Sequence, residues 1–127
     1  MRTMAMPVNI VAPDAEAALF AALLERYAVL QQHELQNRWL ILQAAHVVGQ
    51  TQFMPHIRVH CLMLALGWET RDWPEMAGQL FRIALVPFGH LLGRLPLGNP
   101  GRANVSAFTT MPVSPDVLQL IASVRNT

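Results

Sequence analysis

The sequence predicts an all-α fold with a long ordered segment towards its C-terminus. Apolar residues such as Leu19, Leu23 and Tyr27 recur every four positions, as on the buried face of a helix. Helix start and stop signals flank several such stretches, whereas residues 87–116 are rich in proline and glycine. We therefore expect a four-helix antiparallel bundle, or a pair of helical hairpins, followed by an extended segment and a short final helix.

Four helices are expected before the proline-rich segment. Asp14 and Asp72 are suited to cap the first and fourth helices, and Gly49 is suited to end the second. Pro55 fits the first turn of the third helix, and Pro87 is expected to stop the fourth. The expected helices span residues 15–30, 34–48, 56–66 and 72–86, with a turn, or a continuous helix, through 31–33.

The remaining segments complete a single domain over residues 1–127. Residues 1–12 are expected to form a loose N-terminal arm. Residues 87–116 are expected to wrap around the helices, because so long a loop in a small domain usually has a function or covers something. Ser114 then begins a last short helix that ends near Val124.

Composition restricts the class of protein. Hydrophobic residues make up 53% of the 127 residues and charged residues 13%, so the apolar surface exceeds what a small core buries. The excess is expected to line a cavity, form a subunit interface or face a membrane. Nine basic and eight acidic residues without a cluster argue against nucleic-acid binding.

Targeting and disulfide signals are lacking in the sequence. Cys61 is the only cysteine, which excludes a disulfide within the chain. The apolar stretches are far shorter than the roughly 20 residues that span a bilayer, and the N-terminal residues do not resemble a secretion signal. A cytoplasmic location without a transmembrane segment is therefore expected.

Polar side chains share one face on each of three successive helices. Residues four or seven apart on a helix project in nearly the same direction. If these faces turn towards one another, they form a buried polar site. The residues concerned are Gln43, His46 and Gln50 beside Trp39 on the second helix, His56 and His60 on the third, and Glu75, Gln79 and Arg82 on the fourth.

A metal site is the most concrete interpretation of these faces. His56 and His60 have the i, i+4 spacing with which two imidazoles bind one ion. His46 and Glu75 would complete a set of three histidines and one carboxylate, which suits a divalent transition metal such as Zn, Fe or Cu. The expected surrounding residues, which would orient the ligands or hold an anion, are Gln43, Gln50, Gln79 and Arg82.

Ordinary structural roles compete with this interpretation. A histidine pair at this spacing is often a surface or packing feature, and Glu75 sits at the capping-box position relative to Asp72. Gln79 and Arg82 would also suit a solvated helix face. His90 fits either a loop position or a further ligand. The buried methionines and Cys61 are more typical of packing than of metal ligation.

Several spaced motifs lie between residues 35 and 120. They are Ala45–Gln50, Pro55–His60, Glu75 with Gly78, Gln79 and Arg82, Gly93–Arg94, Gly98–Gly101, Asn104–Ser106 and Met111–Pro112. Together they resemble an uncharacterised bacterial family of small helical proteins, a domain of unknown function often met near heavy-metal resistance genes. The resemblance carries no established activity.

The chain departs from that family at two positions. The resemblance implies an acid three residues before His46, where this sequence has Gln43. A neutral amide is a poor metal ligand, so the change argues against a carboxylate-bridged di-iron centre. Either the metal is mononuclear, or the pocket has another use. Pro100 stands where the family implies threonine, with little expected consequence for the site.

Three functional hypotheses follow. The first is metal binding by the His/Glu set, for metal handling or for a metal-dependent reaction on a small molecule. The second is a metal-free acid–base enzyme or small-molecule-binding protein that uses the same pocket, with Glu75 and His46 as the catalytic candidates. The third is an interaction module whose apolar surface forms a homo-oligomer interface.

Overall fold

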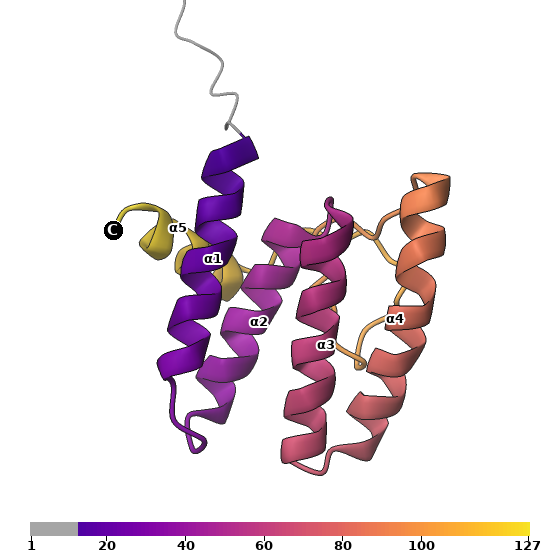
Figure 1. Ribbon diagram of the computed structural model, residues 1–127, viewed down its shortest axis with the longest axis horizontal. Coiled ribbons are helices and arrows are strands. Elements are labelled where there is room, and N and C mark those ends of the chain that lie inside the picture. The colour runs from indigo at the N-terminus through magenta and orange to yellow at the C-terminus, as the bar shows by residue number, and fades with distance from the viewer. Residues whose placement is uncertain (1–12) are drawn as a thin grey trace, which may run out of the picture.

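The computed structural model describes residues 13–127, and the regular structure in this part of the chain is helical (Figure 1). The all-α prediction is therefore confirmed. The predicted arm at residues 1–12 lies outside the described residues. The helices are α1 (Pro13–Val29), α2 (Leu35–Gly49), α3 (Phe53–Glu69), α4 (Trp73–Leu92) and α5 (Pro115–Arg125).

The first four helices form a row in which neighbours run in opposite directions (Figure 1). Each packs against the next, α1 on α2, α2 on α3 and α3 on α4, and α5 packs across α1 and α2. Of the two arrangements expected, this row corresponds to the pair of helical hairpins. The core lies between α1, α2, α3 and α5, where Leu23, Leu42, Met63 and Leu66 are fully buried.

The fourth helix is longer than its sequence suggests. The prediction that it stops before Pro87 is wrong, since α4 continues through Pro87 to Leu92. A proline inside a helix removes one backbone hydrogen bond and bends the axis, but the remaining turns can still form. The helix instead ends at Gly93, whose φ of +66° is the left-handed conformation that favours glycine at a helix end. His90 therefore lies on a helix.

Residues 93–114, called the wrap below, connect α4 to α5 without forming a helix. The Asn99 side chain organises this segment: its Nδ2 donates to the carbonyl oxygens of Ser106 and Thr109, at 2.7 and 3.0 Å, and its Oδ1 accepts from the Gly101 N–H. The side chain is buried, so these bonds are needed to satisfy it. The predicted ordered C-terminal segment is present, but it begins at residue 93 rather than 87.

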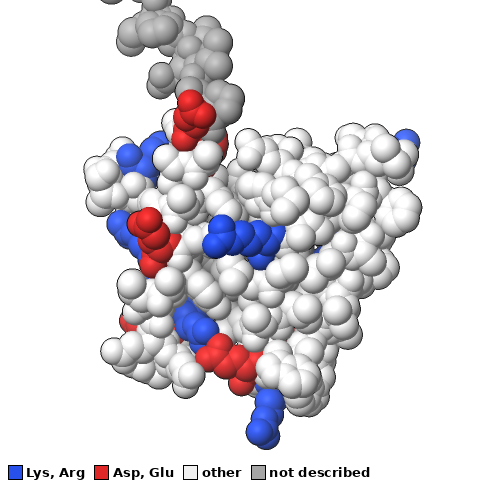
Figure 2. Space-filling model, viewed as in Figure 1, with Lys and Arg blue, Asp and Glu red and all other residues white. Residues whose placement is uncertain are grey.

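Charge is distributed unevenly over the surface. Figure 2 shows a face on which the side over α4 is almost without charged side chains. Several large apolar side chains of α4 are exposed, among them Phe81, Phe88 and Leu91. Within residues 13–127, no helix is both long and apolar enough to cross a membrane.

The wrap approaches α4 most closely at Gly78. A Cβ atom added there would lie 2.3 Å from the Cβ of Ala103, far inside van der Waals contact. Any side chain at position 78 would therefore push the wrap away from the helix.

We predict that Gly78→Ala destabilises the protein, although alanine is the better helix former by about 1 kcal/mol. Overpacking of this kind typically costs about 1–3 kcal/mol in the free energy of unfolding, which denaturant titration measures. Gly67→Ala is the matched control, because its nearest neighbour is the flexible Met76 side chain, whose Cγ would be 3.1 Å away. A Gly78→Ala protein more stable than wild type would contradict the close packing of the wrap.

Candidate metal centre

Three histidine side chains meet between α2 and α3. His46 comes from α2, and His56 and His60 come from α3. The three Nε2 atoms lie 3.1, 3.1 and 3.2 Å from one another. The side chains are buried, with exposed fractions of 1%, 3% and 2%. The histidines predicted to share a site are thus brought together, and they form the one group within residues 13–127 with the spacing of a metal site.

Helix geometry explains the meeting. His56 and His60 are one turn apart and lie on the same face of α3. His46 lies one turn before the end of α2, and His56 lies one turn after the start of α3. Because a short connection joins these antiparallel helices, the last turn of α2 is opposite the first turns of α3.

The second ring nitrogen of His46 and of His60 has an acceptor. His46 Nδ1 donates to the backbone oxygen of Asn99 at 2.7 Å, since a carbonyl can only accept. His60 Nδ1 donates to Gln79 Oε1, also at 2.7 Å. The orientation of this amide is fixed because Gln79 Nε2 donates to the Gly101 oxygen at 3.0 Å.

These contacts determine where the lone pairs of His46 and His60 point. A neutral imidazole carries one N–H, so a proton on Nδ1 leaves a lone pair on Nε2. The two Nε2 atoms face each other at 3.1 Å. Two lone pairs at this distance repel unless a proton or a cation lies between them.

Burial keeps the histidines neutral. It lowers the pKa of His46 well below its usual value, and the neighbouring His60 and His56 lower it further. Burial, followed by His60 and His90, lowers the pKa of His56 to about 3. Burial lowers the pKa of His60 to about 4, against the opposing effect of its hydrogen bond to Gln79. At neutral pH the rings are therefore uncharged. The proton that can still lie between the two lone pairs is that of neutral His56, whose Nε2 is 3.1 and 3.2 Å from Nε2 of His46 and His60.

His90 contacts the triad from outside. Its Nε2 lies 3.0 Å from Nδ1 of His56, and its ring packs edge-on against Phe53. It is thus a partner of a triad histidine rather than a fourth member of the group. The sequence left this position ambiguous because the helix was expected to stop at Pro87.

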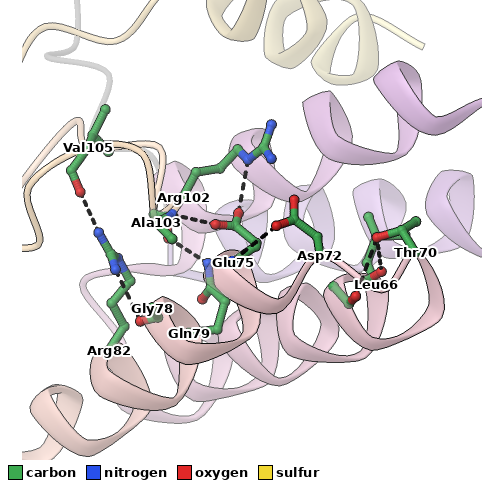
Figure 3. Close-up of polar contacts among 12 residues, drawn as sticks. Leu66, Thr70, Asp72, Glu75, Gly78, Gln79, Arg82, Arg102, Ala103 and Val105 are labelled. Atoms are coloured by element: carbon green, nitrogen blue, oxygen red, sulfur yellow. Dashed lines mark hydrogen bonds and ion pairs between the residues drawn. The ribbon is translucent and has the colours of Figure 1, made fainter.

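Glu75, the carboxylate expected among the ligands, is not placed with the histidines. Its Oε1 accepts from Arg102 Nε at 2.9 Å and its Oε2 accepts from the Ala103 N–H at 2.8 Å (Figure 3). Its own N–H donates to the Asp72 side chain, as the capping interpretation expects. Glu75 therefore attaches the wrap to the start of α4.

The four residues expected around the ligands have different positions. Gln79 bonds to His60 directly, and Arg82 lines the same cavity as the triad. Gln50 instead donates to the Pro96 oxygen at 2.9 Å, while its Oε1 is buried and has no hydrogen-bond partner among residues 13–127. Gln43 is half-buried and lines a separate hollow beside Trp39 and Arg102.

Sequence reasoning missed the contribution of the wrap to the site. The backbone oxygen of Asn99 holds His46, and that of Gly101 holds Gln79. Gly101 has a φ of +86°, and a Cβ atom there would lie 2.6–2.9 Å from ring atoms of His46. The available signal was the Asn-Pro-Gly turn, but nothing in the sequence indicates that this turn covers a histidine on α2.

A cavity of about 310 Å³ lies against the triad. All three histidines and Arg82 line it, together with apolar side chains from α4 and the wrap. The triad is therefore accessible from one side, as a metal site with an open coordination position would be.

We predict that the metal-free protein loses stability in mild acid. Unfolded histidine titrates near 6.5, whereas His56 and His60 titrate at about 3 and about 4 in the folded protein. Between these values the unfolded chain binds more protons, so the free energy of unfolding falls as pH falls. From about pH 7 to about pH 5, denaturant titration should show a loss of about 2 kcal/mol per histidine.

The double variant His56→Leu/His60→Leu should reduce this dependence, because two of the three buried histidines are removed and only His46 remains. A wild-type protein whose unfolding free energy is unchanged over the same range would contradict the burial of neutral histidines.

Comparison with known proteins places the chain in a family. The family described as "Protein of unknown function (DUF3703)" matches residues 14–121, which cover α1 to α4, the wrap and most of α5. Neither the curated proteins nor the solved structures gave a match. The matched region includes the histidine triad, Gln79, Arg82 and the wrap residues that hold them. The chain belongs to this family of unknown function.

Proposed function

We propose that this protein binds one divalent transition-metal ion through Nε2 of His46, His56 and His60. The supporting observation is the convergence of the three Nε2 atoms at 3.1–3.2 Å. Zinc–nitrogen bonds of about 2.0–2.1 Å at tetrahedral angles separate the ligand nitrogens by roughly 3.3 Å, close to this spacing. A cation would take the place of the His56 Nε2 proton, the other group that can bridge the facing lone pairs of His46 and His60.

The ligand set favours some metals over others. Imidazole nitrogen suits Zn, Fe and Cu, whereas Mg and Ca prefer oxygen ligands. A di-iron centre requires several carboxylates, and Glu75 is bonded to Arg102 and Ala103 instead. Gln79 and the Asn99 carbonyl orient two of the rings and make them more basic, as groups surrounding a metal site usually do.

The open side of the triad bears on whether a bound metal would be structural or would act on a small molecule. Structural zinc sites are normally closed by four protein ligands, whereas three ligands and an open position are typical of sites that act on a substrate. A bound ion would supply Lewis acidity at this position. Because the cavity beside the triad is lined mainly by apolar side chains, we favour a reaction on, or capture of, a small molecule over simple metal storage.

A metal-free role is the second candidate. The same cavity, lined by uncharged imidazoles that can accept hydrogen bonds, would suit a small-molecule-binding site. A pKa of about 3 for His56 and about 4 for His60 makes these histidines weak proton acceptors at neutral pH, so binding is favoured over acid–base catalysis. Glu75 is unsuited to that role, since both of its oxygens hold the wrap. This alternative predicts a protein that takes up no metal.

Homo-oligomer formation is supported by a different observation. α4 carries several exposed apolar side chains, and the face in Figure 2 is almost without charged side chains over this helix. Such a face is typical of a subunit interface. This function would be independent of the histidines, so it is compatible with metal binding.

We predict that protein purified without a histidine tag takes up about one equivalent of Zn, Fe or Cu per chain. His56→Ala/His60→Ala should abolish this uptake, because two of the three ligands are lost. Elemental analysis after gel filtration measures it. His33→Ala is the matched control, since His33 is exposed and outside the triad. A wild-type protein that takes up none of these ions would contradict the proposal.

We further predict that Gln79→Ala weakens metal affinity by about 10–100-fold without abolishing binding, because His60 loses the acceptor that orients it. Competition with a chromogenic chelator measures the change. Gln43→Ala is the control, because Gln43 is half-buried on α2 and lines the separate hollow. Equal effects of the two substitutions would show that Gln79 does not position His60.

A further inference from the structure

The cavity beside the triad has a second charged group in its wall. Arg82 extends from α4 towards the wrap, and 7% of its surface is exposed (Figure 3). It lines the same cavity of about 310 Å³ as the three histidines. The positively charged Arg82 and the open side of the triad therefore belong to one cavity.

Arg82 forms no ion pair within residues 13–127. Its NH1 donates to the Gly78 oxygen at 3.0 Å, and its NH2 donates to the Val105 oxygen. These bonds use two of the five N–H donors of a guanidinium. Glu75, two turns earlier on α4, binds Arg102 and Ala103 instead. A largely buried cation without a counterion is costly, so an anion in the cavity would be stabilised.

The rest of the cavity wall is mainly apolar. Aliphatic and aromatic side chains of α4 and the wrap contribute to it, including Leu85, Val86, Phe88, Leu95 and Phe108. These groups suit the hydrocarbon part of a ligand. A cavity of about 150 Å³ holds benzene, so about 310 Å³ suits a ligand of roughly a dozen non-hydrogen atoms.

We infer that this cavity binds a small monocarboxylate with an apolar body, its carboxylate placed between Arg82 and the metal centre. Two positive charges would attract the carboxylate: a divalent metal ion at the triad and Arg82. The first of these rests on the proposed function, and three neutral imidazoles would leave the charge of that ion uncompensated. Arg82 supplies the other charge independently of the metal. The apolar side chains of the wall offer little competing polar surface, which strengthens both attractions.

Octanoate and 1-octanol are matched probes for this inference, because they share a hydrocarbon chain and differ in the charged group. In calorimetric titrations of the zinc-loaded protein, octanoate should bind about tenfold or more tightly than octanol. Arg82→Met should reduce octanoate affinity by about tenfold or more, whereas Arg58→Met should not change it. Arg58 is exposed on α3 and does not line the cavity.

A second variant is needed because Arg82 also bonds to the wrap. Leu85→Trp fills the cavity and leaves the charge of Arg82 in place. It should abolish octanoate binding while the zinc content stays that of wild type. Octanoate binding that survives both Arg82→Met and Leu85→Trp, or equal affinity for octanoate and octanol, would overturn the inference.

Elemental analysis of the same samples separates this inference from the proposed function. A zinc-loaded protein that does not bind octanoate would overturn the inference and leave the metal site intact. A protein that takes up no zinc but binds octanoate, with loss of binding in Arg82→Met, would overturn the proposed metal site and support the carboxylate cavity.

Discussion

The orientation of His46 and of His60 depends on two backbone carbonyl groups of the wrap. The Asn99 oxygen accepts from His46, and the Gly101 oxygen accepts from Gln79, which in turn accepts from His60. Both chains of hydrogen bonds place the ring proton on Nδ1 and direct the Nε2 lone pair towards the centre of the triad. The helices bring the imidazoles together, but the wrap determines which nitrogen is available to a cation.

Polar residues buried on the helices hold the wrap in turn. Glu75 bonds to Arg102 and Ala103, Gln50 bonds to the Pro96 oxygen, and Arg82 bonds to the Val105 oxygen. Because a buried polar group left unpaired is costly, these contacts specify one position for a segment that has no helical structure. Binding of an ion by the triad and ordering of the wrap should therefore be coupled, since each stabilises the arrangement that the other requires.

Helical spacing explains why much of the fold and part of the site could be predicted. Apolar periodicity located the helices, and the i, i+4 relation placed His56 and His60 on one face. Of the predicted N-terminal caps, Asp72 accepts a hydrogen bond from the Glu75 N–H, whereas Asp14 lies within the first turn of α1 and Ser114 makes no such bond. The spacing of residues along one helix predicts the direction in which a side chain projects. It does not predict which residue of the neighbouring helix lies opposite that side chain. Gln79 is the residue of α4 level with His60, and Glu75, four residues earlier, lies about 6 Å farther along the axis. The wrap contacts of Asn99 and Gly101 depend on tertiary structure alone.

X-ray absorption spectroscopy at the metal edge of the loaded, untagged protein tests the account most directly. It reports the ligand types and their distances, independently of any substitution. For zinc held by the triad, we expect three imidazole nitrogens at about 2.0–2.1 Å, a light atom at the open position and no sulfur ligand. A sulfur scatterer, or fewer than three imidazoles, would contradict a centre formed by His46, His56 and His60.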